Sequence, residues 1–84
     1  MNIFQTFTNM LYFITSDFPL AATLLALDYK LHSIDRSYPK KANFLFVKTK
    51  NIDEKIQDFW TGELLVEPKS FWNAQKTLKA QLYA

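Results

Sequence analysis

The sequence predicts an α+β fold: one small domain in which a three-stranded split β-α-β sheet carries its helices mainly on one face. Short apolar runs rich in β-forming residues alternate with segments of helical periodicity, in the order β-α-β-β-α-α. The chain has 84 residues, of which 49% are hydrophobic and 17% aromatic, so its composition is globular and its length allows one core. It contains no cysteine, which excludes a disulfide scaffold and a thiolate metal site.

The first half of the chain begins with a strand and a buried helix. Residues 11–15 form an apolar run of β-formers, as expected for a strand covered on both faces. Ser16 or Asp17 is placed to cap the following helix. Residues 20–27 contain a single polar side chain, so we expect this helix to lie flat on the sheet. Asp28 then occupies a position that favours left-handed backbone geometry.

Two further strands are expected to form a hairpin. Residues 29–35 alternate loosely, which predicts a half-exposed edge strand with Leu31 and Ile34 on opposite faces. Residues 36–41 carry the turn chemistry. Residues 42–49 are apolar on both faces, as expected for the central strand.

The second half of the chain predicts two helices. Asn51 and Glu54 have the spacing of a capping box, and the helix that they open is expected to end near Gly62. Its apolar stripe consists of Ile52, Ile56 and Phe59. Pro68 opens a last helix that extends to about Tyr83. The buried face of this helix consists of Phe71, Ala74, Leu78 and Leu82.

The domain is expected to cover residues 11–84 without an internal linker or repeat. Residues 1–10 form an N-terminal extension that fits no single template. An added strand, a short helix and a self-association arm all remain open for it.

A series of small motifs follows a fixed order along the chain: Thr15-Ser16-Asp17, Leu20-Ala21-Ala22, Leu24-Leu25-Ala26, Leu31, Ile34-Asp35-Arg36, Asp58-Phe59-Trp60, Gly62, Leu64-Leu65-Val66, Pro68, Phe71, Ala74 and Leu78-Lys79. This order resembles a family of short bacterial and bacteriophage proteins known only as a domain of unknown function. Asp28 stands where members commonly carry glycine, and Glu67 stands where Asp would cap the last helix better. The resemblance implies a small α+β domain in a phage or mobile-element setting, and implies no activity.

Nothing in the sequence assembles a catalytic site. The chain has one histidine, His32, and one glycine, so neither a histidine-based catalytic set nor a glycine-rich phosphate loop is available. We therefore expect a protein that is not an enzyme and that uses no cofactor or metal. Asp17 and Pro19 interrupt the apolar stretch of residues 11–27, and no Lys or Arg precedes Lys30. These features argue against a membrane span and a secretion signal, and a cytoplasmic location is expected.

The charges are segregated along the chain. Residues 30–50 carry a net charge of +5, while residues 51–67 carry −4. The basic block consists of Lys30, Arg36, Lys40, Lys41, Lys48 and Lys50, with Tyr38 in the turn. Such a block could follow a phosphate backbone, contact an acidic protein surface, or only guard an edge strand against aggregation.

A second candidate surface lies on the last helix. At about 100° per residue, one flank combines Trp72, Lys76, Lys79 and Tyr83. This flank could stack nucleic-acid bases or anchor a protein; alternatively, Trp72 is mostly buried and the lysine stems cover it. We expect a non-catalytic module that binds nucleic acid through both surfaces. The alternative is a protein-interaction module, either a modulator of a host complex or a homodimer, that uses the same surfaces.

Overall fold

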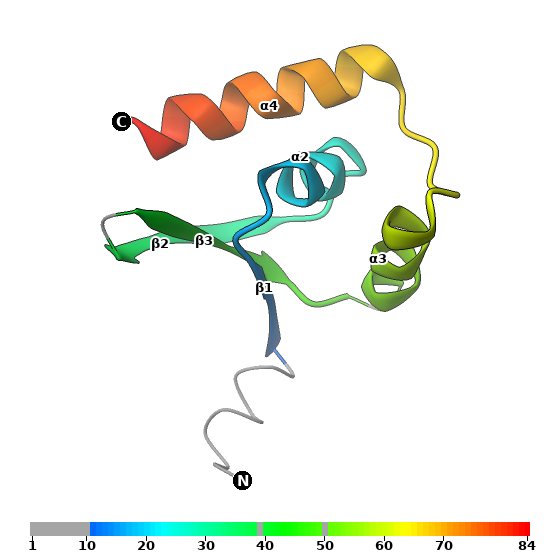
Figure 1. Cartoon of the computed structure of the whole chain (residues 1–84), viewed down its shortest axis with the longest axis horizontal. Coiled ribbons are helices and arrows are strands. Elements are labelled where there is room, and N and C mark those ends of the chain that lie inside the picture. The colour runs from blue at the N-terminus through cyan, green and yellow to red at the C-terminus, as the bar shows by residue number, and fades with distance from the viewer. Residues whose placement is uncertain (1–10, 39, 50) are drawn as a thin grey trace, which may run out of the picture.

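The computed structural model describes residues 11–38, 40–49 and 51–84. Within this part of the chain the elements follow the predicted order (Figure 1). They are β1 (Tyr12–Thr15), α2 (Phe18–Ala26), β2 (Leu31–Tyr38), β3 (Lys41–Val47), α3 (Ile52–Thr61) and α4 (Pro68–Leu82). The α+β class is confirmed. The alternatives for residues 1–10 and the assignment of Lys50 concern positions outside the described residues.

The three strands form one sheet in the order β1-β3-β2, and both pairings are antiparallel. β1 and β2 are therefore parallel to each other with β3 between them, which is the split β-α-β arrangement. β3 is the predicted central strand, and β2 is the predicted edge strand. Phe44 and Phe46 of β3 are 2% and 0% exposed, because this strand has a neighbour on each side and α2 over one face.

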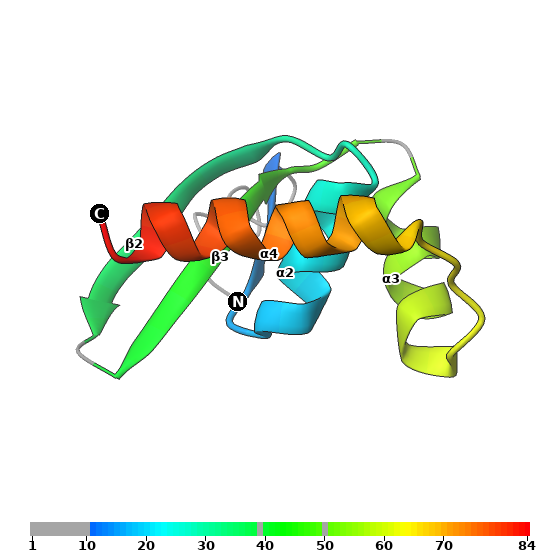
Figure 2. The same ribbon diagram turned by 90° about the horizontal axis from the view of Figure 1, so that it is seen from above.

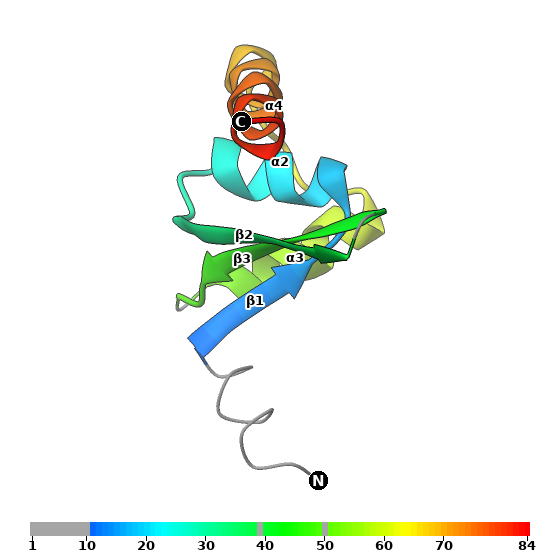
Figure 3. The ribbon, with the colours of Figure 1, turned by 90° about the vertical axis from the view of Figure 1, so that its left-hand side faces the viewer.

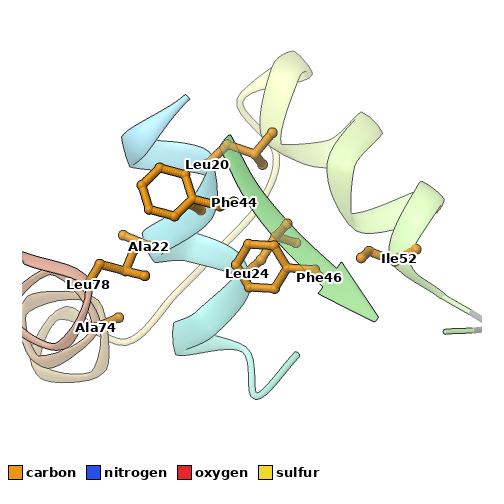
Figure 4. Close-up of a cluster of buried hydrophobic side chains, with 9 residues drawn as sticks. Leu20, Ala22, Leu24, Phe44, Phe46, Ile52, Ala74 and Leu78 are labelled. Atoms are coloured by element: carbon orange, nitrogen blue, oxygen red, sulfur yellow. The ribbon is translucent and has the colours of Figure 1, made fainter. Parts of the chain in front are cut away.

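α2 and α4 are stacked on one face of the sheet. Figure 3 shows α2 between the sheet and α4. This position explains why α2 is apolar on nearly every side: it buries one flank against β3 and the other against Ala74 and Leu78 of α4. In Figure 4, Phe44 and Phe46 approach α2 from the sheet while Leu78 approaches it from α4. α3 lies beyond the end of β3, where Ile52 enters the same core.

The ends of the helices follow local backbone chemistry. Asp17 caps α2, since its Oδ1 accepts the Leu20 N–H at 2.8 Å. Asp28 follows α2 with a φ of 69°, as its position predicts, and Gly62 ends α3 with a φ of 77°. Glu67 caps α4 by accepting a hydrogen bond from a backbone N–H two residues after Pro68.

The predicted capping box at the start of α3 is wrong. Asn51 occupies the N-cap position, but its side chain makes no capping hydrogen bond. Its backbone, at φ −108° and ψ 7°, departs from the extended conformation that lets an N-cap side chain reach back to the first turn. α3 is held by the burial of Ile52 and not by its cap.

β2 departs from simple alternation, which corrects two predictions. Leu31 pairs with Phe46 and Ser33 with Leu45, so the strand contains one extra residue at this point. Leu31 and Ile34 consequently both pack against the core, where alternation had placed them on opposite faces. β2 also continues to Tyr38, past the predicted end of the strand, so the hairpin turn is shorter than expected.

Candidate functional site

The tip of the β2–β3 hairpin and the C-terminal end of α4 form a shared concave surface. A hollow of about 290 Å³ lies between them. Its lining residues are Arg36, Tyr38, Lys40, Lys41, Ala42, Leu82 and Tyr83. The structure thus brings together five of the side chains singled out in the sequence, from segments more than forty residues apart.

Arg36 connects the two elements. Its Nη1 donates a hydrogen bond of 2.8 Å to the carbonyl oxygen of Leu82, in the last turn of α4. A cation at this point also suits the negative end of the helix dipole. Because Leu78 is fully buried against the core, α4 has a fixed position, and Tyr83 is held beside the hairpin.

We call the hollow lined by Arg36, Tyr38, Lys40, Lys41, Ala42, Leu82 and Tyr83 the tip site. Its two tyrosines are exposed. Tyr38 is 64% exposed and Tyr83 is 80% exposed. Among the described residues, neither ring packs against another aromatic ring. Their faces are therefore available to a ligand.

The tip site is positively charged. Arg36, Lys40 and Lys41 line it, and the residues that the structure places in its lining include no Asp or Glu. The nearby carboxylate of Asp35 is engaged by the Ser37 hydroxyl and the Ser37 N–H. These hydrogen bonds, the one from the hydroxyl first, lower the pKa of Asp35 below its ordinary value.

The hollow continues around the hairpin tip. Tyr38, Lys40, Lys41 and Asn43 line a neighbouring depression of about 540 Å³. A third depression, of about 380 Å³, lies between the same two lysines and the start of α2. Lys40 and Lys41 thus border every one of these hollows, so a ligand in any of them meets both ammonium groups.

Lys30 and Lys48, the other described members of the basic block, lie elsewhere. Lys30 is at the opposite end of the hairpin, where its carbonyl accepts the Val47 N–H at 2.9 Å. Lys48 follows directly after β3 at that same end. The described part of the predicted basic surface is therefore divided in two, and of its cations Arg36, Lys40 and Lys41 share a site with Tyr83.

The predicted flank of α4 is divided as well. Trp72 is 62% exposed, so the alternative in which its ring is mostly buried is wrong. Lys76 and Lys79 are also exposed. Trp72 precedes Tyr83 by eleven residues, which separates them by about 16 Å along the helix axis. Tyr83 belongs to the tip site, whereas Trp72 lies toward the other end of α4.

Four exposed apolar side chains were not singled out from the sequence. Leu11 and Ile14 are 46% and 40% exposed, so the expectation that residues 11–15 form a strand covered on both faces is wrong: β1 is an edge strand, and Ile14 lies on the face away from α2.

Trp60, at the end of α3, is 61% exposed, and Leu65, in the following connector, is 89% exposed. Trp60 follows directly after the buried stripe of α3, so helical spacing could have placed it outside the core. Leu65 lies between two half-buried residues, Leu64 and Val66. Alternation along this short extended connector is the sequence signal that could have predicted an exposed Leu65.

Other classes of site find no support in the described part of the chain. His32 is exposed; its ring lies 4.6 Å from that of Tyr12 and its Nδ1 is 3.0 Å from the Ser33 hydroxyl. Within residues 11–38, 40–49 and 51–84, no three His, Asp or Glu side chains cluster as metal ligands. None of the helices described there is both long and apolar enough to span a bilayer.

Comparison with known proteins identifies the family but no activity. A family model with the description Domain of unknown function (DUF5659) matches residues 10–84. Neither the curated proteins nor the solved structures contain a match to the chain.

Proposed function

The chain belongs to the family described as domain of unknown function DUF5659, and we propose that it is a non-catalytic binding module whose ligand is nucleic acid. The observation that carries this proposal is the composition of the tip site: three cations and two exposed tyrosines around one hollow. Lysine and arginine contacts to phosphates supply most of the affinity in nucleic-acid binding, and tyrosine faces accept bases.

Edge protection explains only part of this cluster. Lysines that guard a sheet lie along its unpaired edges. β1 pairs with residues 44–47 of β3, so Lys41 at the start of β3 lies on such an edge, and Lys40 lies in the turn before it. Edge protection does not explain why these lysines share one hollow with Arg36 and two exposed tyrosines. Contact with a nucleic-acid strand would account for that combination.

The proposal is tested by the salt dependence of binding. We would measure the affinity for a fluorescent oligonucleotide between 50 and 200 mM salt, for the wild-type protein and for Lys40→Ala/Lys41→Ala. If each lysine neutralises one phosphate, the double variant should reduce the slope of log K against log salt by about 1.4 to 1.8. An unchanged slope, or the absence of binding at low salt, would refute the proposal.

A matched control removes the same charge from outside the site. Lys30 lies at the other end of the hairpin, and Lys69 lies in the first turn of α4. Both are exposed, so Lys30→Ala/Lys69→Ala should not disturb the fold. This control should retain the wild-type slope, because its charges do not border the tip site.

A protein-interaction module is the second candidate function. Trp60, Leu65 and Trp72 are each more than 60% exposed, and exposed tryptophans are typical hot-spot residues of protein interfaces. The negative charge of residues 51–67 would also complement the hairpin of a second copy. Sedimentation analysis distinguishes this alternative, since a homodimer would show a mass that depends on concentration and salt.

The proposed setting follows from the proposed ligand. A module that binds nucleic acid without cysteine chemistry or a cofactor fits the cytoplasm, and the family resemblance suggests a bacterial or bacteriophage context. Fractionation of cells expressing the tagged chain would test the location.

A further inference from the structure

We propose that the tip site is specific for single-stranded nucleic acid, with bases stacked on Tyr38 and Tyr83 while Lys40 and Lys41 hold the backbone. This inference rests on the proposed function and adds the class of ligand. It follows from the positions of the two tyrosine rings and from the end of α4, which lies against the hairpin and makes it thicker.

The main rival is a hairpin that enters duplex DNA. A two-stranded β-ribbon fits into the major groove, which is about 12 Å wide. Here the hairpin is not free, because the Arg36–Leu82 hydrogen bond holds the last turn of α4 against it. Figures 1 and 2 show this end of α4 above the β2–β3 hairpin. A helix alone has a diameter of about 10 to 12 Å, so the hairpin and α4 together are too thick for the groove.

The tyrosine rings also favour unpaired bases. Tyr38 and Tyr83 come from different elements and both border the hollow of about 290 Å³. This volume is near the lower end of the range for small-molecule pockets, so it suits a single base or nucleotide. In a duplex the faces of the bases are already stacked, and exposing them costs a few kcal/mol. In a single strand the faces are accessible without this cost.

The position of the cations fits the same ligand. Lys40 and Lys41 border the hollow between the rings and also the two neighbouring depressions. A strand whose base enters the hollow can therefore place its flanking phosphates next to both ammonium groups. Aromatic stacking combined with a basic groove is the arrangement by which proteins bind single strands without sequence preference.

The test compares a twelve-nucleotide oligothymidine with a twelve-base-pair duplex, by fluorescence anisotropy at equal salt. Wild-type protein should bind the single strand more tightly. Tyr38→Leu and Tyr83→Leu should each weaken single-strand binding by about 5- to 150-fold, the effect of losing one base stack. Tyr38→Phe keeps the ring and should bind as the wild type does. Because both tyrosines are mostly exposed, the variants should remain folded, and thermal melts verify this.

Trp60→Leu is the matched control, since its ring is as exposed as that of Tyr38 but lies on α3. It should bind as the wild type does, and an equal loss in this variant would contradict the assignment of stacking to the tip site. Duplex binding as tight as single-strand binding, or leucine variants without effect, would overturn the single-strand inference. In that case, lost affinity in Lys40→Ala/Lys41→Ala would still support the proposed function. Failure to bind either oligonucleotide would refute both.

Discussion

Gly62 and Asp28 provide a quantitative test of how the chain ends its helices. Both have left-handed backbone, with φ values of 77° and 69°. An L-residue in this conformation costs about 1 to 2 kcal/mol, because its Cβ approaches the neighbouring carbonyl oxygen. Apart from its two neighbours in the chain, a Cβ built on Gly62 would meet no atom of the described residues within 4 Å. The effect of Gly62→Ala is therefore conformational and includes no steric clash with the core.

The magnitude follows from two opposing contributions. Alanine adds the left-handed cost, and it also reduces the freedom of the unfolded chain, which returns about 0.4 to 1 kcal/mol. We expect Gly62→Ala to lower the free energy of unfolding by about 1 kcal/mol. For a domain of this size, that corresponds to a fall in melting temperature of about 4 to 8 °C.

Asp28→Gly should act in the opposite direction. It relieves the left-handed conformation at the end of α2, but the net gain is small. Asp tolerates this region better than Ala, and the new glycine adds about 0.4 to 1 kcal/mol of freedom to the unfolded chain, which opposes the gain. Circular dichroism melts at 222 nm would measure both variants, with Gln57→Ala on the exposed side of α3 as the control. A Gly62→Ala protein that melts with the wild type, or an Asp28→Gly protein that loses several degrees, would refute the reasoning.

Two further predictions concern α4. Leu78→Ala should lower the free energy of unfolding in urea by about 2 to 5 kcal/mol, because Leu78 is fully buried. Trp72→Ala should leave the melting temperature almost unchanged, because Trp72 is 62% exposed. Similar losses of stability in the two variants would contradict the assigned burial. Glu67 accepts the Ser70 N–H at 2.7 Å, and this bond, with that from Lys69, lowers the pKa of Glu67 below its ordinary value of 4.5. The charged Glu67 side chain therefore contributes its full stability above pH 4.5, and this contribution is lost as the pH falls through the lowered pKa. The difference in melting temperature between the wild type and Glu67→Gln should consequently disappear on acidification.

The sequence was sufficient to predict the order of the elements and the central strand. The signals were strong where one physical requirement dominated. Phe44 and Phe46 lie in a run that is apolar on both faces, which favours a strand with a neighbour on each side. Phe44 and Phe46 are buried under α2, whereas Leu45 and Val47 on the other face are half-buried. Gly62 marked the end of α3, because a left-handed residue is needed there.

The errors arose where other parts of the chain decide the local backbone conformation. The extra residue in β2 is set by its register against β3, and the sequence of β2 alone still reads as simple alternation. The capping box failed because the approach of the chain to α3 gives Asn51 a backbone that is not extended.

The candidate site was predictable as a list of residues but not as a group. The sequence identified Tyr38 and Tyr83, yet their proximity depends on the stacking of α4 over α2 and on the Arg36–Leu82 hydrogen bond. No local pattern contains that information. For the same reason, the sequence could not separate Lys40 and Lys41 from Lys30, which lies at the far end of the hairpin.

The most direct test of the account is a titration of the ¹⁵N-labelled protein with oligothymidine, followed by amide chemical shifts. The account predicts that the largest changes occur in the amides around the tip site, in residues 36–38, 40–41 and 79–84. The acidic helix α3 should show little change, since it lies at the opposite end of the molecule (Figure 2). Unchanged spectra at low salt, or changes centred on Trp60 and Leu65, would contradict the central claim that the tip site binds nucleic acid.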